Sequence, residues 1–222
     1  MPARDPQSRC RLVLVAPEME DMSEQARLVG DALSGGDVAT VIVIARDADD
    51  RLAQARVAAI IDLAHAREVA VIVVGDTRIA ARAGADGVHL EGANAATAAE
   101  TVEAHGPRLM VGVDGAKTRH DALELGEARP DYIFFGRFGY DTAPASHPRN
   151  LALGEWWSQM VAIPCIVQGG ADIDSVREVA ASGAEFVALS SAVFGGSQTP
   201  GEAVRAANAL LDDASQEAAG AA

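Results

Sequence analysis

Residues 163–173 read IPCIVQGGADI, an apolar and largely β-branched run that ends in two glycines. An amphipathic segment follows at 173–182, and a second apolar run occupies 186–189. Ser190 and Ser191 come directly after that run. The change of period and the turn residues predict a strand, a glycine turn, a helix, a second strand and a short final helix.

The two loops of this unit have the composition of an anion-binding site. Gly169 and Gly170 allow backbone N–H groups to approach an anion closely, and a helix N-terminus adds unpaired donors. In many (β/α)₈ barrels, the loops after the last two strands hold a phosphate group. We therefore predict that Gly169, Gly170, Ser190 and Ser191 bind the phosphate of a small ligand. A tight βα turn with a capping serine is the alternative interpretation.

The rest of the chain alternates between strand-like and helix-like segments. Strand-like runs occupy 11–16, 38–45, 69–74, 85–90, 109–113 and 132–135. Helical periodicity appears in 21–33, 53–66, 78–83, 95–104, 118–128, 151–160 and 201–211. Alternation with short connections predicts parallel strands joined by right-handed crossovers. An open doubly wound sheet is disfavoured, because no glycine-rich dinucleotide fingerprint follows the first strand.

We therefore predict an α/β fold with a single (β/α)₈ TIM barrel over residues 11–211. Residues 1–10 are expected to be disordered, and the alanine-rich tail 212–222 is expected to fray. A small residue followed by an acid precedes three of the strands, at 85–86, 130–131 and 184–185. This repeated pattern is only weak support for a closed barrel, since many αβ turns have such a composition.

Composition limits the classes of function. The 18 basic and 32 acidic residues give a formal net charge of −14, which argues against nucleic acid and an anionic membrane as partners. Cys10 and Cys165 show no disulfide or metal spacing. With no signal-peptide pattern and no apolar run of membrane-spanning length, we expect a cytoplasmic protein. Whether it is a monomer or a homo-oligomer stays open at this point.

In a TIM barrel the chemistry lies at the C-terminal ends of the strands. The candidate residues at those ends are Arg46, Asp76, Glu91, Asn94, Asp114 and Arg137. Asp76 and Glu91 could share a magnesium ion, which prefers carboxylate and water oxygens. Either acid could instead cap the helix that it precedes. His89 lies inside an alternating strand, which favours a buried, hydrogen-bonded structural histidine.

Residues 71–194 resemble thiamine phosphate synthase and its relative, the thiazole tautomerase. The resemblance is strongest in ADGVHL at 85–90, in VGV at 111–113, and in the glycine and serine pairs of the two predicted phosphate loops. It implies a Mg²⁺-assisted transferase of thiamine biosynthesis, which joins a pyrimidine methyl diphosphate to a thiazole alcohol phosphate and releases diphosphate. It also implies that the thiazole phosphate binds at Gly169, Gly170, Ser190 and Ser191.

The metal residues of the family are partly retained. The Asn-Asp pair of the family reads Gly75-Asp76 here, so the resemblance keeps one metal carboxylate at Asp76. The second carboxylate corresponds to the amide of Asn94, with Glu91 nearby. The resemblance therefore implies a magnesium site at Asp76, Glu91 and Asn94.

The residues that hold the diphosphate in the family differ here. The Leu-Arg-x-Lys motif reads IARDA at 44–48, and the Thr-x-Thr-Lys loop reads YDTAP at 140–144, both without lysine. A serine of the family is Asp114, and the tautomerase histidine corresponds to Ala116. Arg46 or Arg137 would have to replace the lysines, because departing negative charge needs a nearby cation.

Three hypotheses follow from these residues. The first is a synthase-type transferase that uses Asp76, Arg46, Arg137 and Asp114 in catalysis. The second is a non-catalytic phosphate-binding or regulatory barrel. The third is a different heterocycle or phosphosugar enzyme in which Asp114 acts as a general base.

Overall fold

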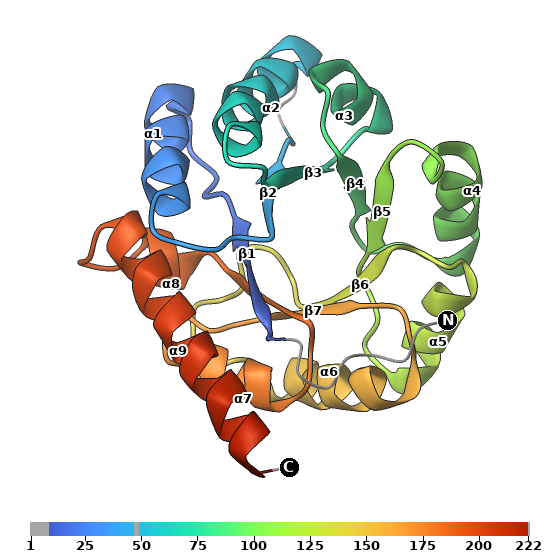
Figure 1. Ribbon diagram of the computed structural model, residues 1–222. Helices are drawn as coiled ribbons and strands as arrows, with labels where there is room; N and C mark the ends of the chain where they lie inside the picture. The colour runs from blue at the N-terminus through green and yellow to red at the C-terminus, as the bar shows by residue number, and fades with distance from the viewer. Residues whose placement is uncertain (1–8, 47–48, 222) are drawn as a thin grey trace.

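The computed structural model describes residues 9–46 and 49–221, and its strands close into a parallel barrel in the order β1 to β8 (Figure 1). The strands are β1 (Arg11–Val15), β2 (Thr40–Ile44), β3 (Ala70–Val74), β4 (Gly87–Leu90), β5 (Met110–Val113), β6 (Tyr132–Phe135), β7 (Cys165–Gln168) and β8 (Phe186–Leu189). Arg11 of β1 pairs with Phe186 of β8, which closes the ring. The predicted single (β/α)₈ TIM barrel is confirmed.

Helices follow the strands and surround the barrel, as Figure 1 shows. They are α1 (Met22–Leu33), α2 (Asp50–His65), α3 (Thr77–Ala83), α4 (Ala95–His105), α5 (Arg119–Glu127), α6 (Pro148–Met160), α7 (Ser175–Ala181), α8 (Ser191–Phe194) and α9 (Pro200–Ala221). None of the helices in the described residues is long and apolar enough to cross a lipid bilayer.

The structure describes the C-terminal end of the chain but not most of the N-terminal segment. The last helix, α9, does not end at Leu211 but continues to Ala221, in place of the frayed tail expected at 212–222. The alanines of this stretch, with Gln216 and Glu217, favour helix even where no apolar stripe remains, which explains the extension. Most of the segment 1–10, expected to be disordered, lies outside the described residues.

The apolar side chains form two layers, one inside the barrel and one between strands and helices. The interior layer contains alternate residues of several strands, among them Val13, Ile42, Ile72, Phe134 and Ile166. The outer layer joins the opposite faces of the same strands to the helices. This alternation follows from the two-residue period of a strand, and it leaves polar side chains at the strand ends.

The acids that precede three strands tie neighbouring strands together at the N-terminal face of the barrel. Asp86, before β4, accepts a hydrogen bond from the N–H of Val71 in β3 at 2.7 Å. Asp131 accepts one from Val111 at 2.7 Å, and Glu185 accepts one from Cys165 at 2.9 Å. The repeated pair of a small residue and an acid therefore has a structural role: its acid links β3 to β4, β5 to β6 and β7 to β8 at the face opposite the mouth.

Candidate functional site

The glycine loop after β7 and the serines after β8 lie at the C-terminal mouth, as predicted, and three of their backbone N–H groups are already engaged. The N–H of Gly169 donates to the carbonyl of Ala188 at 2.9 Å. The N–H of Gly170 donates to Ser175 Oγ at 2.9 Å, and the N–H of Ser191 donates to the Asp141 carboxylate at 2.6 Å. Ser190 contributes its carbonyl, which accepts the N–H groups of α8. An anion can therefore use the N–H groups of Gly169, Gly170 and Ser191 only if these contacts change.

The connection between β6 and α6, residues 136–147, lies across the glycine loop, and we call it the β6–α6 loop. Its carbonyls at Ala143 and Pro144 accept the N–H groups of Ala171 at 2.7 Å and Asp172 at 3.1 Å. A Cβ atom built on Gly170 would lie 2.0 Å from the Pro144 oxygen. Glycine at position 170 is therefore required by the passage of this loop, whether or not a ligand is bound.

Helix α6 begins at Pro148, three residues earlier than the pattern predicted. Proline is favoured in the first turn of a helix because its backbone nitrogen needs no partner there. The side chain of His147 caps this helix, since its Nδ1 accepts the N–H of Arg149 at 3.2 Å. The β6–α6 loop therefore ends in a fixed position.

The side chain of Arg137 remains within the same loop. Its guanidinium lies over the ring of Tyr140, 3.8 Å from the centroid, and its backbone N–H donates to Gln168 Oε1 at 2.7 Å. The arginine predicted to replace a family lysine is thus stacked on a loop tyrosine. A stacked guanidinium still has its edge available for an anion.

The three predicted magnesium ligands each have another role in the structure. Asp76 caps α3 through the N–H of Arg78 at 2.8 Å and also pairs with the Arg78 guanidinium, with the closest contact at 2.5 Å. Glu91 forms an ion pair with Arg46. Asn94 Oδ1 caps α4 by accepting the N–H of Thr97 at 2.9 Å. The capping alternative considered for Asp76 is therefore the arrangement present.

In this arrangement Asp76 and Glu91 are paired with arginines and Asn94 caps a helix, so the three side chains form no preassembled magnesium site. Among residues 9–46 and 49–221, no group of three or more histidine, cysteine, aspartate or glutamate side chains is arranged to hold a metal. The Arg78 side chain, together with its N–H, lowers the pKa of Asp76 to about 2, so the carboxylate is already charge-compensated.

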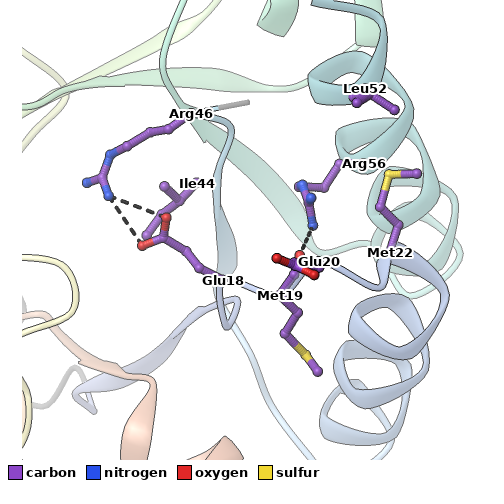
Figure 2. Close-up of a pocket in the computed structure, with 8 residues that line it drawn as sticks. All are labelled: Glu18, Met19, Glu20, Met22, Ile44, Arg46, Leu52 and Arg56. Atoms are coloured by element: carbon purple, nitrogen blue, oxygen red, sulfur yellow. Dashed lines mark hydrogen bonds and ion pairs between the residues drawn. The ribbon is translucent and has the colours of Figure 1, made fainter. Parts of the chain in front are cut away.

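Arg46 connects the ends of three strands. It follows β2, pairs with Glu91 after β4, and lies 3.2 Å from Glu18 after β1. Figure 2 shows Arg46 and Glu18 facing each other at the edge of a pocket. The volume of this pocket is about 460 Å³. The pocket is lined by Glu18, Met19, Glu20, Met22, Ile44, Arg46, Leu52 and Arg56. On its far side, Arg56 donates to the carbonyl of Met19 at 2.7 Å.

A second pocket, of about 300 Å³, lies at the ends of β3 and β4. It is lined by Val74, Gly75, His89, Leu90, Glu91, Gly92, Ala93, Asn94 and Thr97. Two of the predicted metal residues, Glu91 and Asn94, thus line the same pocket.

Beneath this pocket is a buried polar network that sequence reasoning found only in part. His89 is buried, as predicted, and its Nδ1 lies 2.9 Å from the hydroxyl of Tyr132. Its Nε2 lies 3.5 Å from Asp114 Oδ2, and the other Asp114 oxygen accepts the N–H of Gly92. Burial, followed by the charges of Asp114 and Asp131, raises the pKa of Tyr132, so its hydroxyl stays protonated.

Tyr132 was not among the predicted site residues. The Tyr132 ring packs directly against Gly112, where a Cβ atom would lie 1.9 Å from the ring. A glycine inside a strand can mark a close approach by another group, and that signal was available at 111–113. The sequence could not show that the approaching group is Tyr132, because Tyr132 lies on a different strand from Gly112.

The structure therefore brings some predicted residues together and keeps others apart. Arg46 meets Glu91, Asp114 meets His89, and the two loops predicted to bind phosphate meet the β6–α6 loop. Asp76 is held by its own helix instead of by Glu91. The class of protein defined by this architecture is a TIM barrel whose polar residues and pockets gather at the C-terminal mouth.

Comparison with known proteins assigns a family. Residues 12–193 match the sequence model described as "Thiamine monophosphate synthase". The chain is 33% identical over 205 residues to the thiamine-phosphate synthase of Rhodospirillum centenum, covering 91% of this chain and 98% of the relative. It is 33% identical over 215 residues to that of Hyphomonas neptunium, covering 93% and 96%. The chain belongs to the thiamine monophosphate synthase family, and the resemblance stated from the sequence is confirmed.

Solved structures share the fold at lower identity. Thiamine phosphate pyrophosphorylase from Pyrococcus furiosus superposes with a TM-score of 0.75 at 20% identity, covering 95% of this chain and 99% of that chain. A 3-hexulose-6-phosphate synthase superposes with a TM-score of 0.67 at 22% identity, covering 89% and 98%. These two similarities support the architecture only.

Proposed function

We propose that this protein is a thiamine phosphate synthase-type transferase, which joins a pyrimidine methyl diphosphate to a thiazole alcohol phosphate. The observation that carries the proposal is the family match across residues 12–193, with two relatives named thiamine-phosphate synthase aligned over nearly their whole length. The glycine and serine loops stand at the barrel mouth, where that reaction would need them.

The proposed reaction breaks one bond and forms one bond. The C–O bond between the pyrimidine methylene and diphosphate breaks, and diphosphate leaves with the electron pair. The thiazole ring nitrogen then donates its lone pair to the methylene carbon, which gives thiamine phosphate. In this scheme the protein must align the two substrates and stabilise the charge that develops on the leaving group.

Arg46 is the residue that we propose to meet the leaving diphosphate. It stands after β2, where the family has its basic motif, and it lines the larger pocket. In the structure its guanidinium is shared between Glu18 and Glu91, which reduces its availability to an anion. Substrate must therefore draw Arg46 away from at least one carboxylate.

A cytoplasmic location is also proposed. Cys10 is a free, buried thiol, as expected of a protein in a reducing compartment. Burial raises the pKa of Cys10 to about 12, so this thiol stays protonated and unreactive at neutral pH.

The proposed function is tested by incubating the purified protein with both substrates, with and without Mg²⁺, and measuring thiamine phosphate by chromatography. We expect product in amounts equal to the diphosphate released. Arg46→Gln should lower kcat, whereas Glu100→Gln, an exposed change on α4, should leave it unchanged. Binding of the thiazole phosphate without turnover would instead identify a non-catalytic barrel.

A further inference from the structure

The Asp141 carboxylate contacts the loop after β8, which is one of the two loops predicted to bind phosphate. It lies in the β6–α6 loop, is only 5% exposed, and accepts the N–H of Ser191 at 2.6 Å. Ser191 and Asp141 are 50 residues apart in the chain, so the contact is a tertiary one. A buried carboxylate that accepts a short backbone hydrogen bond is held much as a bound anion would be.

The rest of the loop closes over the same place. Ala143 and Pro144 accept the N–H groups of Ala171 and Asp172, directly after the glycine pair. Ser146, which is 3% exposed, donates its N–H to Glu178 of α7 at 2.6 Å. Two buried anchors at 141 and 146 thus flank an exposed stretch at 142–145. The loop is fastened to the β7 and β8 ends, where the proposed function needs the thiazole phosphate.

A carboxylate and a phosphate cannot both occupy this position. One backbone N–H cannot donate a full-strength hydrogen bond to two anions at once, and two negative charges in contact repel strongly where water is excluded. A loop that needed only an anchor could use a neutral acceptor such as asparagine. The charge of Asp141 therefore acts against phosphorylated ligands in particular.

We propose that Asp141 is a specificity-determining residue, which occupies the place of a ligand phosphate while the β6–α6 loop is closed. A phosphorylated thiazole then binds only by displacing Asp141 from Ser191, whereas the unphosphorylated thiazole alcohol meets no such competitor. The inference rests on the proposed function for the identity of the ligand and for the position of its phosphate.

The test compares two ligands that differ only in the phosphate. The wild type, Asp141→Asn and Asp141→Ala are titrated with the thiazole alcohol phosphate and with the thiazole alcohol, following backbone amide signals by NMR. The Ser191 and Gly170 amides report directly on the contested donors. Asp174→Asn is the matched control, because it removes one exposed charge at the start of α7 that makes no capping hydrogen bond.

We expect Asp141→Ala to bind the phosphate at least about tenfold more tightly than the wild type, with little change for the alcohol. Asp141→Asn keeps an acceptor oxygen but no charge, so its affinity for the thiazole alcohol phosphate should lie between those of the wild type and Asp141→Ala. The Asp174→Asn control should resemble the wild type. Equal or weaker phosphate binding in both Asp141 variants, with the Ser191 amide unmoved by phosphate, would overturn the proposal.

Inorganic phosphate separates this inference from the proposed function. If neither thiazole binds but inorganic phosphate shifts the Ser191 amide more readily in Asp141→Asn, the carboxylate competition stands and the thiazole assignment fails. If the thiazoles bind and all variants prefer the phosphate equally, the synthase assignment stands and the role of Asp141 fails. Asp141→Asn is the decisive variant if Asp141→Ala does not fold.

Discussion

Arg46 and Glu91, which follow β2 and β4, form an ion pair across the mouth of the barrel. Glu18 lies 3.2 Å from the same guanidinium, so one cation faces two carboxylates. The cation in the best position to receive a diphosphate is therefore shielded by the protein's own acids. Anion binding at the mouth is therefore limited by the ion pairs that Arg46 forms with Glu18 and Glu91.

Removing Glu91's charge should release Arg46. We expect Glu91→Gln to tighten the binding of inorganic diphosphate by up to about fivefold, because an exposed ion pair contributes roughly 0.2–1 kcal/mol. Isothermal calorimetry at low salt measures the change, with Glu100→Gln as the charge-matched control on α4. Unchanged or weaker binding in Glu91→Gln would show that Arg46 is not the diphosphate cation.

Asp76 should contribute a pH-dependent part of the stability. Its pKa in the folded protein is about 2, held down by the Arg78 side chain and N–H, against an ordinary value of about 4. A depressed carboxyl pKa stabilises the fold above the ordinary value and loses that effect as the pH falls towards the folded value. The loss is therefore expected between about pH 4 and pH 2.

The comparison that tests this is Asp76→Asn, which keeps a capping side chain but removes the charge. The wild type should be slightly more stable than Asp76→Asn in urea from pH 7 to pH 5, and the difference should shrink below pH 4. In an Arg78→Gln background the same substitution should have less effect. A difference that disappears already at pH 5 would contradict the assignment.

Magnesium should bind no more weakly after Asp76 is removed. Because the Asp76 carboxylate is engaged by Arg78, calorimetry without diphosphate should give the same negligible affinity for wild type and Asp76→Ala. A measurable affinity in the wild type that Asp76→Ala abolishes would show that the acid leaves Arg78 to ligate the ion.

Gly112 should tolerate no side chain. A Cβ atom at this position would lie 1.9 Å from the Tyr132 ring, which is fixed by its hydrogen bond to His89. We expect Gly112→Ala to lower the free energy of unfolding by roughly 1–3 kcal/mol, as overpacking of a core does. Gly220→Ala, where nothing lies within 4 Å of the new Cβ, should not destabilise the protein. Equal stability of both variants would contradict the geometry.

The fold was predictable because its signals are local. β-Branched runs such as those of β2 and β3 report burial on both faces of a strand, and each is followed by a helical period. The exceptions concern ends of helices. Pro148 begins α6 through its own fixed φ, and α9 persists beyond Leu211 because its composition alone favours helix.

The site was predictable only as a set of donors and charges. The sequence shows that Gly169, Gly170 and Ser191 offer N–H groups, but their acceptors depend on the path of the β6–α6 loop. In the same way, the sequence predicts Glu91 as a metal ligand, whereas in the folded barrel it forms an ion pair with Arg46. Such pairings join strands whose neighbours are fixed by closure, and no local pattern encodes them.

The initial rate of thiamine phosphate formation tests the central claim most directly. With both substrates present, we predict product that is saturable in each substrate and accompanied by one diphosphate per molecule formed. Asp141→Asn should lower the KM for the thiazole alcohol phosphate. No product above a protein-free control, in a sample whose Ser191 amide responds to the thiazole phosphate, would contradict the claim that this barrel is a synthase.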